Sequence, residues 1–206
     1  MKKTFMVLML GLVSIICFGQ NVGTTETIES VEYAENSESE IVELIRNEGT
    51  LKKIELIEIP SVKGISFEAI IVTDLIKNNK YGGVHITTIY TAPYIKKYYM
   101  GTIDNMEIDG CINALTMIKE NILPTTPEVY TKIKYTTKDF VEIGAVFSPT
   151  NGGVLTPAPG TGKWFAYIST KSYLSNSKIS FQAKHIDSLI TAFRQAKQII
   201  QEEISK

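Results

Sequence analysis

The chain has 206 residues, a formal net charge of −1 and 21% charged residues. This balanced composition lacks the large excess of basic residues that is typical of proteins that bind nucleic acid or a membrane surface. Of its two cysteines, Cys17 lies in a segment that we expect to be removed. The remaining Cys111 then has no partner for an intramolecular disulfide, so stability must come from a hydrophobic core.

Residues 1–19 have the pattern of a secretory signal peptide. A basic start precedes an apolar run over residues 5–18, and the residues that follow predict cleavage before Gln20. The run is shorter than the ~20 apolar residues that a transmembrane helix needs, and no later segment of the sequence is long and apolar enough. We therefore expect an exported protein, periplasmic or secreted, with no transmembrane segment in the mature chain. The alternative is a lipoprotein anchored through an acylated Cys17, against which the large Ile16 argues.

Residues 20–49 form an acidic leader with eight acidic residues and one basic residue, whereas 18 basic and 14 acidic residues follow from Thr50 onward. The leader has few large apolar side chains, so we expect most of it to be flexible. Ser37 and Glu40 match a capping box ahead of apolar residues at helical spacing. This pattern predicts a short helix that ends at Arg46.

Beyond Thr50 the sequence predicts strands and then a helix. β-Branched and aromatic residues between turn residues indicate strands near residues 52–59, 66–74, 83–91 and 96–103. The hydrophobic period then changes from 2 to 3.6. An apolar stripe over residues 108–122 predicts an amphipathic helix, with Asp104 and Glu107 as its cap.

The second half of the sequence has the same order. Strands are expected near residues 130–136, 140–147, 163–169 and 178–181. An amphipathic helix follows over residues 186–200. Between two of these strands, the Gly- and Pro-rich stretch Pro149–Gly162 is expected to be a long irregular loop, whose role is left open.

A repeat with an offset of 78 residues relates the two halves. Residues 106–115 align with residues 184–193. Asp109 then falls on Asp187, and Lys119 falls on Lys197. Both aspartates are expected in the first turn of a helix, where the helix dipole favours a carboxylate.

We therefore predict an α+β fold of two tandem ββββα units, residues 50–123 and 128–204, in one domain over residues 50–206. Each unit of such a repeat needs a neighbour to bury its apolar face. One amphipathic helix should pack on each antiparallel sheet, and a pseudo-twofold axis should relate the two units. The helix residues expected in the core include Cys111, Leu115, Ile190 and Phe193.

The second unit contains a glycine-basic-aromatic strand and a short strand ahead of a helix from Ala183. These strands are Gly162-Lys163-Trp164-Phe165-Ala166-Tyr167-Ile168 and Lys178-Ile179-Ser180-Phe181. The order resembles the ββββα repeat of the whirly and Pur-type proteins. In the first unit, Gly83-Val84-His85-Ile86-Thr87 stands in place of the basic-aromatic start. The resemblance implies a protein that binds single-stranded nucleic acid through aromatic and basic residues on a curved sheet.

One stretch of the sequence and one later strand supply the candidate binding residues. Aromatic rings beside cations stack on bases or sugar rings, and the cations hold phosphates or carboxylates. The alternative is an ordinary solvated strand face, which also alternates polar with apolar residues. Because of that alternation, Tyr98 and Tyr99 cannot share one face. The candidates are Tyr90, Tyr94, Lys96, Lys97, Tyr98 and Tyr99, extended by Tyr130, Lys132 and Lys134.

No motif in the sequence identifies a catalysed reaction. Gly160-Thr161-Gly162-Lys163 has Pro157 where a phosphate-binding loop needs glycine, and a predicted strand follows it instead of a helix. His85 and His185 have no cysteine or clustered carboxylate at ligand spacing, so we expect no metal site and no cofactor. Cys111 lies within the apolar stripe and is expected to be a core residue.

These patterns favour an exported, non-catalytic binding or interaction module whose ligand is unknown, with a glycan or a protein of the cell envelope as its partner. One alternative is a binder of single-stranded nucleic acid, which the near-neutral charge and the export signal argue against. Another is an enzyme whose site is assembled from residues scattered along the chain. The oligomeric state is left open.

Overall fold

The computed structural model describes residues 39–151 and 157–206, so the expected signal peptide and residues 20–38 lie outside the described residues. The first unit comprises α1 (Glu40–Arg46), β1 (Lys52–Val62), β2 (Ile65–Asp74), β3 (Asn79–Ala92), β4 (Ile95–Asp104) and α2 (Asn105–Met117), which a π-helical turn (Ile118–Ile122) extends. The second comprises β5 (Thr131–Thr136), β6 (Glu142–Asn151), β7 (Pro157–Ser169), β8 (Lys178–Gln182) and α3 (Ile186–Ile204), with 3₁₀ turns at Ser175–Ser177 and Ala183–His185.

The strands form two four-stranded antiparallel sheets, in the orders β1-β2-β3-β4 and β5-β6-β7-β8. Each sheet is followed in the chain by a helix, which confirms the predicted α+β fold of two ββββα units. Asn79 and Pro157, where β3 and β7 begin, are separated by the repeat offset of 78 residues. The repeat in the sequence therefore corresponds to a repeat of strands.

The stretch expected as a loop, Pro149–Gly162, is largely a hairpin. Pro149 pairs with Gly162, and Asn151 pairs with Pro157. The neighbouring strands β5 and β8 do not reach this far, so the hairpin has a free edge on both sides. Proline and glycine are tolerated at free edges, which is why the composition of this stretch concealed its pairing.

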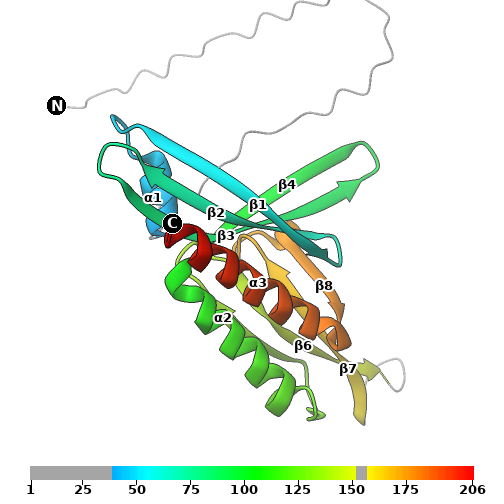
Figure 1. Ribbon diagram of the computed structural model, residues 1–206. Helices are drawn as coiled ribbons and strands as arrows, with labels where there is room; N and C mark the ends of the chain where they lie inside the picture. The colour runs from blue at the N-terminus through cyan, green and yellow to red at the C-terminus, as the bar shows by residue number, and fades with distance from the viewer. Residues whose placement is uncertain (1–38, 152–156) are drawn as a thin grey trace, which may run out of the picture.

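The two helices lie side by side (Figure 1); α3 packs across β1, β2 and β3 of the first sheet, and α2 contacts β3 and β4 of the first sheet and β6 of the second. One continuous cluster of buried apolar residues includes members of both sheets, α2 and α3. At its centre Phe67 of β2 meets Phe193 of α3 edge to face, with ring centroids 5.7 Å apart. The helix residues predicted to be buried are buried, namely Cys111, Leu115, Ile190 and Phe193.

Two reciprocal ion pairs join the helices. Lys197 Nζ lies 2.7 Å from Asp109 Oδ1, and Lys119 Nζ lies 2.7 Å from Asp187 Oδ1. Asp109 and Asp187 are equivalent residues of the repeat, and so are Lys119 and Lys197. A twofold rotation that exchanges the two units therefore also exchanges the two ion pairs. The helices must therefore run antiparallel about the pseudo-twofold axis (Figure 1). All four side chains are at least partly exposed, so each pair stabilises the fold by only about 0.2–1 kcal/mol.

The placement of Asp109 differs from the expectation. Asp187 lies in the first turn of α3, but α2 begins at Asn105 and its first-turn acidic residue is Glu107. Asp109 lies one turn further along, where it reaches Lys197. The ion pair to the other helix, not the dipole of its own helix, therefore accounts for this aspartate.

The short helix α1 packs on the outer face of the first sheet. Its N-cap is Ser39, and its buried Ile41 contacts Ile70 and Val72 of β2. Asp104, which was expected to cap α2, makes no side-chain cap bond there. Its carboxylate instead accepts hydrogen bonds from Ser39 Oγ at 2.7 Å and from the backbone N–H of Glu40 at 2.9 Å. The folded body therefore includes the end of the acidic leader.

Because the core is shared, damage to one unit should unfold both. We expect Leu115→Ala in α2 to lower the free energy of unfolding by about 2–5 kcal/mol, through lost burial and a residual cavity. The single tryptophan, Trp164, lies in the other unit. Its fluorescence and the far-ultraviolet circular dichroism should therefore report the same shifted urea midpoint.

The matched control is Met106→Ala, which truncates a side chain of the same helix that is 76% exposed. It should leave the midpoint nearly unchanged. A Trp164 transition that stays at its wild-type position in Leu115→Ala would contradict a shared core.

Candidate functional site: a lysine-rich sheet face

The aromatic cluster of the first unit lies on a hairpin that projects beyond its sheet (Figure 1). Pairing between β2 and β3 stops where Ser66 faces Thr87, whereas pairing between β3 and β4 continues to Ala92 opposite Ile95. Residues 88–99 therefore form a two-stranded projection, which we call the β3–β4 arm. Its exposed large side chains are Ile89, Tyr90, Tyr94, Ile95 and Tyr98.

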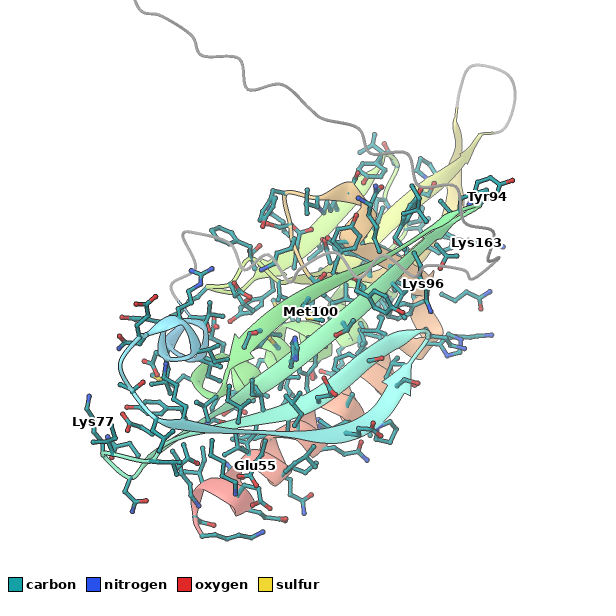
Figure 2. The ribbon with its side chains drawn as sticks, turned by 90° about the horizontal axis from the view of Figure 1, so that it is seen from above. Glu55, Lys77, Tyr94, Lys96, Met100 and Lys163 are labelled. Carbon is teal, nitrogen blue, oxygen red and sulfur yellow. The ribbon has the colours of Figure 1, made fainter. Side chains whose placement is uncertain are left out.

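The arm divides the six candidate residues between two faces. Tyr90 pairs with Lys97 on one face, and Tyr99 lies on the same face opposite Thr88. Lys96 and Tyr98 lie on the other face, with Lys96 Nζ 5.4 Å from the centroid of the Tyr98 ring. Tyr94 is fully exposed at the tip (Figure 2). Tyr98 and Tyr99 thus lie on opposite faces, as strand alternation requires.

The other three candidates belong to the second sheet. Tyr130 precedes β5 and is 61% exposed. Lys132 and Lys134 alternate on β5 with Ile133 and Tyr135, which pack against the core. Both lysines therefore point to the outer face of this sheet. The nine candidates consequently lie on two separate sheets.

Lys132 and Lys134 converge on a buried carboxylate. Lys132 Nζ lies 2.6 Å from Glu142 Oε1, and Lys134 Nζ lies 3.4 Å from Glu142 Oε2. The hydroxyl of the buried Tyr167 donates a third bond to Glu142 at 2.7 Å. Burial by itself would raise the pKa of Glu142, but the bonds from Lys132 and Tyr167 outweigh burial and lower it. Burial raises the pKa of Tyr167, and its bond to Glu142 adds to that effect.

A glycine makes room for the tyrosine ring. Gly144 pairs with Tyr167 across β6 and β7. A Cβ at this position would lie 2.9 Å from the hydroxyl oxygen of Tyr167. Any larger residue would therefore push the ring away from Glu142.

Two further lysines, which the sequence did not single out as site residues, share this face. Lys178 Nζ lies 4.2 Å from the centroid of the Tyr167 ring, and Lys132 Nζ lies 5.3 Å from it. Burial lowers the pKa of Lys178, and repulsion from Lys132 adds to that effect. Lys163 is exposed on β7 (Figure 2). It pairs with Ser148, one of the outward-facing residues of β6, and therefore points to the same face.

Together these residues make up what we call the lysine face, one outward sheet face that carries Lys132, Lys134, Lys163, Lys178, Glu142 and Tyr167. By the strand register, Glu142 is the only carboxylate among the outward residues that the structure describes in β5–β8. Alternation along β7 would place Lys163 and Tyr167 on one face, and this is the sequence signal that could have identified them as site residues. Nothing in the local sequence linked them to Glu142.

A second polar cluster surrounds His85 on the outer face of the first sheet. His85 Nδ1 lies 3.5 Å from Glu68 Oε2, and neither ring nitrogen has a hydrogen-bond partner among the described residues. The buried Lys171 and Asp139 from the second unit lie near it, 3.4 Å apart. Burial lowers the pKa of His85, while the charges of Glu68 and Asp139 oppose that effect.

In the part of the chain that the structure describes, no group of three or more His, Cys, Asp and Glu side chains is placed to hold a metal ion. Cys111 is buried in the core as predicted, and burial raises the pKa of its thiol. No helix in residues 39–151 and 157–206 is long and apolar enough to cross a membrane.

Comparison with known proteins gives no match to a protein-family model, a curated protein or a solved structure. The likeness to the whirly and Pur-type repeat therefore rests on the quoted strand residues and on the order of elements.

The lowered pKa of His85 predicts the direction in which the unfolding free energy changes with pH. The unfolded chain takes up a proton near the ordinary pKa of 6.5, while the folded protein resists it. The stability from neutral His85 is therefore present above the unfolded-state pKa and is lost as the pH falls towards the folded-state pKa. We expect the unfolding free energy of the wild type, relative to His85→Gln, to decrease between about pH 7.5 and pH 5.5.

Urea denaturation of the two proteins measures this difference. His185 titrates in the same window, but it is present in both proteins and cancels. A difference that is independent of pH would show that His85 is not held neutral by burial.

Proposed function

We propose that this protein is an exported, non-catalytic binding module that holds an anionic ligand on the lysine face. The observation that carries the proposal is one outward sheet face that presents four lysines and a single carboxylate. Lys132 and Lys134 contact Glu142, Lys178 lies over the Tyr167 ring, and Lys163 lies further along the same face. Such a face concentrates positive charge although the whole chain is nearly neutral. The secretory signal in the sequence supports a location in the periplasm or outside the cell. An acidic glycan of the cell envelope has the charge and the location that this face requires.

The two hydrogen-bonded groups at the centre of the face, Glu142 and Tyr167, favour binding over catalysis. General acid–base catalysis works best with a pKa near the working pH. Here the pKa of Glu142 is lowered and that of Tyr167 is raised, so both move away from neutrality. Glu142 is also occupied by three donors. The pair therefore holds the lysines in place and is not poised to transfer protons.

The geometry also favours an acidic glycan over single-stranded nucleic acid. Binding of unpaired bases relies on open aromatic rings on which the bases stack. Tyr167 is fully buried, with Lys132 and Lys178 over its ring. The remaining aromatic rings near it are the half-buried Phe165 on β7 and the exposed Tyr130, which precedes β5. Nucleic acid stays the second candidate because the tyrosines of the β3–β4 arm are exposed and aromatic.

Substitution of the peripheral lysines should weaken an anionic ligand. Lys134→Ala and Lys163→Ala leave the close contacts of Glu142 with Lys132 and Tyr167 in place. We expect the double variant to bind an acidic oligosaccharide about tenfold or more weakly, because each lysine contributes a charge-assisted contact. Calorimetric titration at two salt concentrations measures the loss, and higher salt should reduce wild-type affinity.

The control is Lys77→Ala, which removes an exposed lysine from the turn between β2 and β3 (Figure 2). It should bind like the wild type. A neutral oligosaccharide and a single-stranded oligonucleotide complete the series. Tight, salt-sensitive oligonucleotide binding that the double variant loses would favour the second candidate. Absence of binding to every anion would refute the proposal.

Neutralising the central carboxylate should have the opposite effect. Glu142→Gln removes the one negative charge of the face and keeps an oxygen that accepts the Tyr167 hydroxyl. Lys132 and Lys134 then become available to an external anion. We expect several-fold tighter binding of the acidic oligosaccharide, together with lower stability because a charged hydrogen-bond network is weakened. Weaker binding of the anion would show that Glu142 contributes to the ligand site directly.

A further inference from the structure

The first strand of the first sheet has a free edge. β1 ends the strand order β1-β2-β3-β4, and its pairing with β2 is regular from Lys52 to Ile59. No strand among the described residues lies on its other side. Backbone N–H and C=O groups of alternate residues there face solvent and form a template for another strand.

The side chains of this edge include exposed apolar residues. Ile54 and Leu56 are 48% and 50% exposed. The register places them opposite Val72 and Ile70, on the outer face that α1 covers. Ile54 and Leu56 therefore continue the apolar cluster beneath α1 out to the edge of the sheet.

Edge strands are usually protected by charged residues, proline or bulges. In β1 such features flank the apolar pair, with Lys52 and Lys53 before it and Pro60 after it, and Ile54 and Leu56 stay exposed between them.

We propose that two copies of this chain associate through antiparallel pairing of their β1 strands, centred on Glu55. In this register Ile54 of one copy faces Leu56 of the other, and Lys52 faces Glu58. Symmetry generates each contact twice. The four residues share the outer face of the sheet, since they alternate along one strand. The outer-face residues of segment 52–58 are therefore complementary to themselves in both charge and hydrophobicity.

The surroundings of Glu58 support this register. Glu58 is exposed and lies directly opposite Glu68 of β2, and like charges in directly opposed positions are destabilising. No described cation forms a salt bridge with Glu58. Lys52 of the second copy would supply one. Within its own chain Lys52 Nζ donates to the carbonyl oxygens of Ile45 and Asn47. Asp74 lies opposite Lys52 on β2, and its pKa is lowered by hydrogen bonds from the backbone and further by the charge of Lys52.

The centre of the pairing carries one unfavourable contact, which makes the register testable. Glu55 faces Glu55 of the second copy across the symmetry axis. In each chain Lys53 Nζ lies 2.7 Å from Glu55 Oε1 and offsets part of the repulsion. Figure 2 shows Glu55 at the free margin of the sheet, beside the end of α3. The pairing would join the two four-stranded sheets into one continuous sheet.

Sedimentation equilibrium of the purified protein over a range of concentrations tests the proposal. We expect a monomer–dimer equilibrium in which Leu56→Lys raises the dissociation constant about tenfold or more, since it places charge in the apolar centre. The matched control Ile76→Lys changes a residue that is 69% exposed in the turn between β2 and β3, and should leave the constant unchanged. A wild-type protein that is monomeric at all concentrations would overturn the proposal. Equal effects of the two lysine variants would also overturn it.

Charge reversal tests the register. Glu58→Lys should weaken association, because it places two lysines opposite each other, and Lys52→Glu added to it should restore association. Glu55→Gln should strengthen it by removing the central repulsion. Thermal unfolding followed by circular dichroism confirms that each variant is folded. A double variant that is folded but stays as weak as Glu58→Lys would overturn the pairing of Lys52 with Glu58.

Discussion

The fold depends on the packing of α2 against α3 between two sheets that cannot bury their inner faces alone. Each unit contributes one four-stranded sheet and one helix, and the buried residues of all four parts form one cluster. The two reciprocal aspartate–lysine pairs fix the helices antiparallel. Their small energies mean that the apolar contact, for example between Phe67 and Phe193, supplies the stability while the charges select the alignment.

The inner faces of both sheets are buried in the core. The outer faces are not constrained in this way, and they differ between the two units. The repeat offset aligns His85, Thr87 and Ile89 of β3 with Lys163, Phe165 and Tyr167 of β7. All six are outward positions in their strands. In the first unit this face is partly covered by α1 and holds the His85 cluster. In the second unit it carries the lysine face. The same backbone frame thus supports two different surfaces.

The sequence predicted the elements well because their signals are local. Alternation and helical spacing located the eight strands and both long helices of the described residues, and the aspartate–lysine repeat pointed to the twofold relation of the units. The hairpin at Pro149–Gly162 was missed because proline and glycine normally indicate loops and are tolerated only at free edges.

The candidate site was less predictable, because its contacts join residues far apart in the chain. Alternation alone placed Lys132 and Lys134 on one face. Their convergence on Glu142, and the bond from Tyr167, depend on the strand register of β5, β6 and β7. Asp104 is a similar case. Its position predicted a cap for α2, but its carboxylate caps α1, 64 residues away in the chain.

The central claim is that two repeated units form one cooperative body through a shared core. Native-state hydrogen exchange under increasing denaturant tests it most directly, since it measures the opening free energy of each backbone amide. The slowest amides of β2, β3 and α2 should exchange with the same free energy as those of β6, β7 and α3, and that value should equal the global unfolding free energy. Exchange of one unit through a lower-energy opening, while the other stays protected, would contradict the claim.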